Sequence, residues 1–500
     1  MKPLALRPSS GRGESQSNTA HRQARGAVSL SNRGHLLERL TFFSLALLFS
    51  AGFFETEVLH LGPITLTTTE LVMALYMGCV FLWALAASRM TIPRDPIFWA
   101  LVLWWAAMAV SAVFCQRYRA MALKYWIRFG AGVALYVALR WHMIGMNLKE
   151  KAFKIMAGTA VFVGALGIVE HFAFKIVEPI LRPFRSEVFV GVPQHAFASS
   201  GVLFDGKTMI VRSSSIFMHA NSLGYFLALS SLLLLSTFPV KEKKRTLWLY
   251  CGALAMFFYV VILTYSRGAL IALTLPLAAV LAAAYRNNRT DPAVRRRARN
   301  MAALAIAVAA LALIVHKDFF RGAGTLVPAK FLDKAEERII GVRRPVPEDN
   351  AEYQRSGMTS RFALWRAAIR MWRSHPIVGV GPDNFRMLYY ENLDYVNEDL
   401  ESHKGLLRAH DLFLDVMSET GLLGLGALLA FLAAVTAATR KMLRKAVNIE
   451  TLSLAAAFGV FLIGNLFDVI YYYYIFMIPV LALFAAIADK AARQPEVVER

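Results

Sequence analysis

The sequence contains few of the residues that build metal sites. Its only three cysteines, Cys79, Cys115 and Cys251, lie in or beside apolar runs and lack metal-ligand spacing, so we interpret them as packing residues. The chain also contains no DxD-like pair, no HExxH motif and no cluster of cysteine and histidine. The sequence therefore predicts neither a bound metal nor a cofactor, and ordinary side chains must supply any chemistry.

Charge is scarce as well. Only 18% of the 500 residues are Asp, Glu, Lys or Arg, whereas 57% are hydrophobic, which is more than a soluble protein of this length usually carries. Apolar runs of about 18 residues or more recur, as is typical of membrane-spanning helices. We therefore predict an all-α polytopic membrane protein with about 12 transmembrane helices. The predicted spans are residues 40–54, 66–87, 97–115, 121–139, 153–174, 218–238, 246–264, 268–285, 301–315, 412–438, 451–467 and 470–488.

The apolar runs themselves are nearly free of charge. The main exceptions are Glu70, Arg128, Glu170 and Asp468, and most of these lie near the ends of a predicted span. A proton- or sodium-coupled transporter usually needs ionisable residues near the middle of the membrane, in pairs or relays. Their scarcity argues against a transporter.

The charge that is present is mostly positive, with a formal net charge of +21. On a soluble protein this excess would suggest nucleic acid as a partner, but no nucleic-acid-binding motif accompanies it. Lys and Arg instead gather in alternate loops, for example at 241–245 and 295–299, as cytoplasmic loops of membrane proteins do. The pattern places both termini in the cytoplasm and predicts the lipid bilayer, with no nucleic acid, as the surroundings.

The predicted spans divide the chain into five parts. The first 37 residues are rich in Ser, Arg and Gly, and the apolar run that follows them lacks the features of a cleavable signal. In chain order, the parts are a disordered basic cytoplasmic tail (1–37), transmembrane helices one to nine with an outer loop at 175–217 (38–315), a long outer loop subdomain (316–411), helices ten to twelve (412–488) and a second cytoplasmic tail (489–500).

Within the long loop, the stretch from Ser360 to Pro376 has apolar residues at helical spacing. Phe362, Trp365, Ile369 and Trp372 are predicted to form one face of a helix that lies on the bundle or at the lipid interface.

The distinctive polar residues all fall on the outer face of this topology, although they are far apart in sequence. They lie in the stretches from Arg212 to Gly224, Thr264 to Leu270 and Ser374 to Phe385, and in the segment from Arg408 to Asp411. Each of these stretches was placed independently of the others, and all fall on the same face of the membrane. This agreement suggests one extracytoplasmic site.

Two arginines and one histidine in these stretches suit transfer chemistry at a membrane surface. Arg212 and Arg267 offer permanently charged, planar groups that fit phosphate oxygens and could replace a metal in stabilising a leaving pyrophosphate. His410 could act as a general base on an acceptor hydroxyl, oriented by Asp411 or by Asp415 one turn later.

Each of these residues also has a structural interpretation. Asp411 is a good N-cap, Arg267 could pair with lipid headgroups, and Arg212 could anchor a loop. The "GLLGLG" run at 421–426 fits a helix-packing face of small residues, and "GVGPDNF" at 379–385 fits a turn.

Four stretches together resemble the bacterial O-antigen ligase/polymerase superfamily, in the same order and at similar spacing, over about residues 205–485. They are "RSSSIFMHANSLGYFLALS", "LTYSRGALIAL", "HPIVGVGPDNF" and "HDLFLDVMSETGLLGLG". The family histidine falls on His410, followed by a Gly-x-x-Gly pattern at Gly421 and Gly424, and the family arginines fall on Arg212 and Arg267. Asp411 departs from the family, in which Asn, Ser or Gln is common.

The resemblance implies an inverting, metal-independent glycosyltransferase with a GT-C-like fold in the bacterial inner membrane. Its donor would be a glycan linked to undecaprenyl pyrophosphate, and the outer loops at 175–217 and 316–411 would be periplasmic. Catalysis would rest on His410, Arg212 and Arg267. The predicted substrate-binding residues are Asn221, Ser266, Arg361, His375, Arg408 and Asp411.

Three functions stay open. The acceptor is the lipid A core if the protein is an O-antigen ligase, which the spacing of the His410 motif favours, and a growing lipid-linked glycan if it is a polymerase. A non-enzymatic carrier or flippase for lipid-linked sugars is the third, but it should line a passage through the membrane with polar groups, and here they concentrate on one face.

Overall fold

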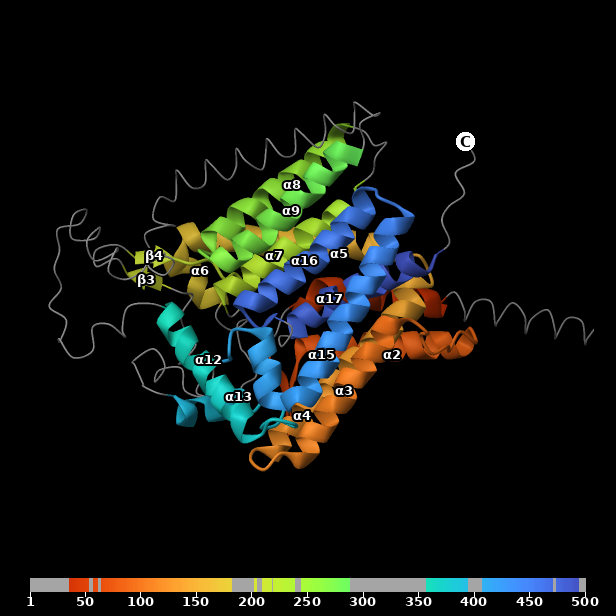
Figure 1. The fold of residues 1–500 in the computed structure, drawn as a ribbon. Coiled ribbons are helices and arrows are strands. Elements are labelled where there is room, and N and C mark those ends of the chain that lie inside the picture. The colour runs from red at the N-terminus through yellow and green to blue at the C-terminus, as the bar shows by residue number, and fades with distance from the viewer. Residues whose placement is uncertain are drawn as a thin grey trace, which may run out of the picture.

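Two groups of helices lie side by side in the computed structural model and share one seam (Figure 1). One group packs α5, α7, α8, α9 and α16 together, and the other packs α2, α3, α4, α15 and α17. Helices α16 and α17 join the groups, because α16 contacts both α15 and α17. The described residues are 36–53, 57–61, 64–181, 202–204, 209–217, 219–238, 244–287, 357–393, 407–470 and 474–493.

Eight of the described helices are long and apolar enough to cross a membrane, which confirms a polytopic helical membrane protein. They are α2 (Thr68–Ala86), α3 (Pro96–Phe114), α4 (Arg119–Ala138) with its π-helical extension η2 (Leu139–Ile144), α5 (Lys149–Phe172), α8 (Lys244–Leu263), α9 (Arg267–Asn287), α15 (Leu412–Lys445) and α16 (Ile449–Phe467). Apolar helices α7 (Ala220–Ser236) and α17 (Tyr474–Ala492) and the helical residues 36–50 coincide with three further predicted spans. The predicted span at 301–315 lies outside the described residues, so the count of twelve stays a prediction, as does the GT-C likeness.

Two small antiparallel hairpins interrupt the helical pattern. Strands β1 (Glu57–Leu61) and β2 (Ile64–Thr67) form one, and β3 (Val202–Phe204) and β4 (Met209–Val211) form the other. The prediction of an all-α chain missed both, because strands of three to five residues carry too little pattern to stand out between apolar runs. The second hairpin bears on the predicted site, since β4 ends directly before Arg212.

Helix α15 is sharply kinked at Gly421, whose φ is 63° and ψ is −160°. The loop after α12 runs along the kink: the N–H groups of Leu422 and Leu423 donate to the carbonyls of Pro376 and Ile377. A Cβ on Gly421 would lie 2.3 Å from the backbone of Ile377. Gly421 is therefore a kink residue held against another backbone. It is not part of the helix-packing face that the sequence had suggested.

The same loop confirms the turn predicted for "GVGPDNF". Gly379 and Gly381 have φ values of 70° and 108°, which only glycine adopts readily. The N–H groups of Val380 and Gly381 donate to the carbonyls of Ser418 and Glu419, just before the kink. Two glycine-rich stretches far apart in sequence thus build one tight backbone crossing.

This crossing yields a matched pair of substitutions. Gly421→Ala should lower the free energy of unfolding by more than about 1 kcal/mol, since left-handed backbone costs a side chain that much even before the clash with Ile377. Gly426→Ala, in the same helix with no neighbour within 4 Å, should leave stability equal or raise it by about 0.5–1 kcal/mol. Thermal unfolding in detergent measures both, and equal effects would contradict the kink's role.

Helix α12 (Gly357–Ser374) lies across the end of the bundle in Figure 1, followed by the short helices α13 (Phe385–Leu388) and η7 (Tyr389–Asn392). The predicted face does not pack on the bundle: Phe362 is 50% exposed, and Trp365, Ile369 and Trp372 are only partly buried. Its alternative position at the lipid interface stays a prediction. Small side chains allow α12 to approach α15 closely, so the aromatic residues flank the contact instead of filling it. The buried face consists of Ala363, Leu364, Ala367, Ala368 and Met371.

Candidate functional site

The segment between β4 and α7 is fixed to the end of α5. The buried carboxylate of Glu170 accepts the N–H groups of Ser214 at 2.9 Å and Ser215 at 2.6 Å, and the hydroxyl of Ser213 donates to the carbonyl of Gly167. The hydroxyls of Ser214 and Ser215 also donate, to Glu170 and to the carbonyl of Val163, so each of the three serines after Arg212 has a hydrogen-bonded side chain. These bonds fix the backbone that presents Arg212 at the end of the bundle where α7, α9 and α15 begin, which we call the His410 end.

One chain of hydrogen bonds links Arg212 to His410. The Arg212 guanidinium donates to the carbonyl of Thr264 at 2.9 Å and to the side-chain oxygen of Asn221 at 2.8 Å. The amide of Asn221 donates to Asp468 at 3.3 Å, and the other oxygen of Asp468 lies 3.1 Å from Nδ1 of His410. This hydrogen-bonded network connects four segments that are separate in sequence. It links the two predicted catalytic residues, Arg212 and His410, through Asn221 and Asp468, which the catalytic prediction did not include.

Asp468 caps the C-terminus of α16 and is 6% exposed. Burial alone would raise its pKa, but the hydrogen bond and charge of His410, the charge of Arg361 and the N–H of Val469 outweigh burial, so the pKa is held below its ordinary value. The carboxylate is therefore ionised and can only accept hydrogen bonds. This makes Nδ1 of His410 the donor and leaves Nε2 of a neutral imidazole free to take a proton.

The backbone around His410 is held from both sides. The indole of Trp365 on α12 donates to the carbonyl of Ala409 at 2.9 Å, and the N–H of Ala409 donates to Asp415 at 3.3 Å. His410 itself has a φ of 52°, an uncommon backbone for a residue other than glycine. These contacts therefore fix the direction in which the His410 side chain leaves the start of α15.

The carboxylate that orients His410 differs from the predicted ones. Asp411 accepts the N–H of Leu414 at 2.9 Å and so is the N-cap of α15, which confirms that interpretation. Asp415 faces Ala409 and Arg408. The orienting carboxylate is Asp468, because the end of α16 reaches His410 across the seam. Asp411 is instead engaged in capping α15.

Three guanidinium groups gather at this site. Burial, together with the nearby positive charges of Arg361 and Arg267, lowers the pKa of Arg212 to about 10, so the group stays protonated at neutral pH. Among the described residues, no hydrogen-bond or ion-pair partner contacts the guanidinium of Arg267 or that of Arg361. Within this part of the chain, Arg212 is thus held by hydrogen bonds, whereas Arg267 and Arg361 are not.

Helix ends add to the positive potential. Helix α7 begins at Ala220 beside Asn221, α9 begins at Arg267, and α15 begins directly after His410 and its capping residue. Each helix N-terminus carries roughly half a positive charge, which favours phosphate. Three helix starts lie around one ionised aspartate, with two arginines that form no hydrogen bond to the described residues. This arrangement suits a ligand with several negative charges.

Tyr225 is a further residue of the site that the sequence did not predict. It lies one turn after Asn221 on α7 and is 1% exposed. A Cβ on Gly268 would lie 2.2 Å from its hydroxyl oxygen, and one on Gly464 would lie 3.2 Å from its ring. The only signal in the sequence is the helical spacing of Asn221 and Tyr225, together with a glycine directly after Arg267.

Residues 251–432 match the model of a protein family described as O-antigen ligase. This part of the chain is similar to the O-antigen ligase family. A comparison with curated proteins gives no match. The O-antigen ligase segment contains Arg267, Arg361 and His410, whereas Arg212 and Asp468 lie outside it and join it through the hydrogen bonds described above.

Two residues predicted to bind substrate in the O-antigen ligase segment have other roles in the structure. Ser266 is 4% exposed, and its hydroxyl accepts the N–H of Ala269 at 3.3 Å, so it caps α9. His375 follows α12 and contacts Ser374. Fourteen residues of mostly helical chain separate it from Arg361, which corresponds to ~20 Å. The structure does not bring His375 to the network.

Arg408 is also poorly placed to bind substrate, since it is 4% exposed and surrounded by carboxylates. Its guanidinium lies 2.6 Å from Glu419, 3.3 Å from Asp415 and 3.6 Å from Asp383. Arg386 also pairs with Asp383, at 2.7 Å. This buried cluster ties the His410 loop to α13 and to the first turns of α15, so Arg408 supports the site from behind.

Arg408→Ala is therefore expected to destabilise the protein more than it alters substrate binding. Removing one partner from a buried ion pair costs about 3–5 kcal/mol, because the carboxylates are left without a counter-charge. The expected drop in the unfolding temperature is measured in detergent, with the exposed Arg373→Ala as the control. An unchanged unfolding temperature with a raised KM for the donor would restore a substrate role.

Proposed function

We propose that this protein is an inverting, metal-independent glycosyltransferase in the bacterial inner membrane. It moves a glycan from undecaprenyl pyrophosphate to an acceptor hydroxyl on the periplasmic face. The family match supports glycan transfer from a lipid-linked substrate. The observation that carries the proposal is the network from Arg212 to His410 beside Arg267 and Arg361, whose guanidinium groups form no hydrogen bond or ion pair with the described residues.

In the proposed reaction, the acceptor hydroxyl gives its proton to Nε2 of His410 as its oxygen attacks the anomeric carbon of the donor sugar. A new glycosidic C–O bond forms on the face opposite the bond that breaks, so the configuration inverts. The electron pair of the broken bond leaves with the diphosphate, and Arg267 and Arg361 stabilise its charge. Asp468 stabilises the imidazolium until the proton is released.

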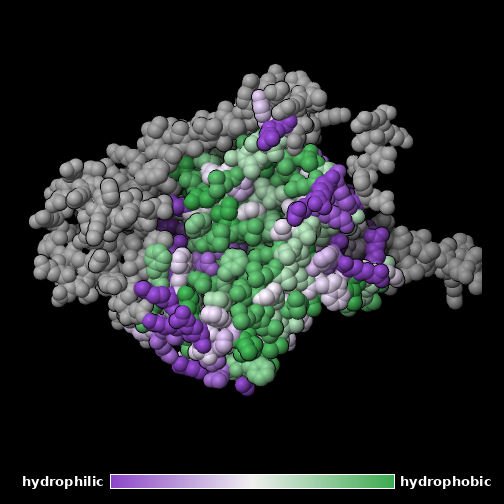
Figure 2. Space-filling model, viewed as in Figure 1, coloured by the Kyte–Doolittle hydropathy of each residue, from purple (hydrophilic) through white to green (hydrophobic). Residues whose placement is uncertain are grey.

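The distribution of charge supports a periplasmic site. An apolar belt lies between hydrophilic groups at two ends of the molecule (Figure 2). The end opposite His410 carries many basic residues, as cytoplasmic ends of membrane proteins do. Those with described positions include Arg89, Arg94, Arg140, Lys149, Lys154, Arg440, Lys441, Arg444, Lys490 and Arg493.

Ligation to the lipid A core is the function we place first, because the matching family is described as O-antigen ligase. Polymerisation of lipid-linked repeats is the second. A deletion strain separates them. Loss of long glycans from lipopolysaccharide while polymerised lipid-linked chains accumulate identifies a ligase, and accumulation of single repeats identifies a polymerase. Movement of donor across the membrane without any new glycosidic bond would contradict both and favour a carrier.

A further inference from the structure

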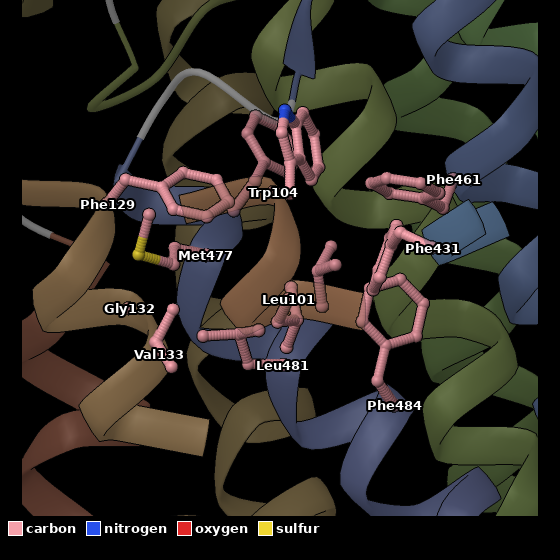
Figure 3. Close-up of a pocket in the computed structure, with 12 residues that line it drawn as sticks. Leu101, Trp104, Phe129, Gly132, Val133, Phe431, Phe461, Met477, Leu481 and Phe484 are labelled. Atoms are coloured by element: carbon pink, nitrogen blue, oxygen red, sulfur yellow. The ribbon is translucent and has the colours of Figure 1, made fainter. Parts of the chain in front are cut away.

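A partly open apolar cavity lies at the seam between the two helix groups. Figure 3 shows side chains from α3, α4, α15, α16 and α17 around this common space. The lining residues are Leu101, Trp104, Phe129, Gly132, Val133, Phe431, Phe461, Phe476, Met477, Val480, Leu481 and Phe484.

The cavity lies below the candidate site along the same helices. Phe461 on α16 precedes Asp468 by seven residues, or ~10 Å along the helix. Phe476 lies in the first turn of α17, at the His410 end, and Phe484 lies about two turns further into the bundle. Phe431 is ten residues past the kink of α15, which begins beside His410. The space therefore extends from beneath the polar network toward the middle of the bundle.

The residues that line the cavity favour a hydrocarbon ligand. Apart from the indole nitrogen of Trp104, the lining side chains carry only carbon, hydrogen and one thioether sulfur, and half of these residues are aromatic. Gly132 allows close approach of Met477, since a Cβ there would lie 2.5 Å from its sulfur, and methionine adapts readily to irregular apolar ligands. A polar or charged group in this space would lose its hydration without gaining a partner.

We propose that this cavity holds the first isoprene units of the carrier lipid's polyprenyl chain. The inference rests on the proposed function and adds to it the binding site of the lipid tail. A diphosphate held by Arg267 and Arg361 puts the first carbons of its chain at the His410 end, directly above the cavity. The acyl chain of an ordinary phospholipid has no such anchor here, because its headgroup does not carry a diphosphate.

The test compares donors that carry the same glycan diphosphate on one isoprene unit or on three. The wild-type protein should use the three-unit donor with a kcat/KM at least about tenfold higher, since each buried methylene contributes several-fold in affinity. Val133→Phe, which fills the cavity from α4, should raise KM for the three-unit donor and abolish this preference. The matched Ile127→Phe lies on the same helix with a 62% exposed side chain and should keep the preference.

Equal use of both donors by the wild-type protein would overturn the cavity assignment while transfer itself, and so the proposed function, stands. Retention of the preference by a folded Val133→Phe would overturn it too. No transfer from any donor would instead refute the proposed function.

A second measurement does not depend on the fold of a variant. Farnesyl diphosphate carrying a photoreactive group should label residues such as Met477 in the wild-type protein, and unlabelled farnesyl diphosphate should compete. Labels confined to lipid-facing side chains, or equal competition by phosphatidylglycerol vesicles, would contradict the proposal and indicate a general lipid site.

Discussion

Replacement of His410 by alanine is expected to reduce glycan transfer by about 10²–10⁴-fold in kcat, the range that general-base catalysis contributes. The physical reason is that Nε2 is the proton acceptor that the geometry presents, with Nδ1 occupied by an ionised Asp468 at 3.1 Å. Transfer from a lipid-linked donor by purified protein measures the effect. The control is His375→Ala, which removes an imidazole outside the network and should leave the rate unchanged.

Asp468→Asn tests whether the two residues act as one unit. An amide cannot stabilise an imidazolium as a carboxylate does, so the single variant should also lose most of its activity. The double variant with His410→Ala should then be no slower than His410→Ala alone, because the aspartate acts only through the histidine. A further large loss in the double variant would show that Asp468 has a separate role.

Replacement of Arg267 or Arg361 by alanine is the second large expected effect. Each should lower kcat by about 10²–10³-fold, which is the cost of removing one preorganised group from a developing negative charge. Neither guanidinium forms a hydrogen bond or an ion pair with the described residues, although the charge of Arg361 acts on Asp468, so we expect both groups to reach the leaving diphosphate. Lysine substitutions should recover part of the rate, because they restore the charge but not the planar pair of donors.

A matched control separates a local effect from the loss of one positive charge. Arg373 lies on the same helix as Arg361, exposed and near its C-terminal end, and Arg373→Ala should leave kcat within about twofold of the wild type, as exposed charges contribute little locally. If Arg267→Ala raises KM and leaves kcat unchanged, the residue only binds lipid headgroups in the ground state. That outcome would contradict the proposed role in stabilising the leaving group.

The sequence alone determined the class of protein and the features that depend on neighbouring residues. Apolar run length predicted membrane helices, because a bilayer of fixed thickness demands about 20 apolar residues whatever the surrounding fold. Local chemistry predicted the cap of Asp411 and the turn at 379–385, since each rests on bonds to residues a few positions away. The alternation of basic loops brought Arg212, Arg267 and His410 to one predicted face, and their catalytic roles stay predictions.

Tertiary structure decided every feature that depends on a meeting of distant segments. It gave His410 the carboxylate of Asp468, 58 residues away, and buried Arg408 among acids although it stands only two residues before His410. It made Gly421 a kink residue against another backbone and formed the apolar cavity between the two helix groups. These outcomes depend on how the helices pack against one another, and the spacing of residues along one helix carries no record of the helix it meets.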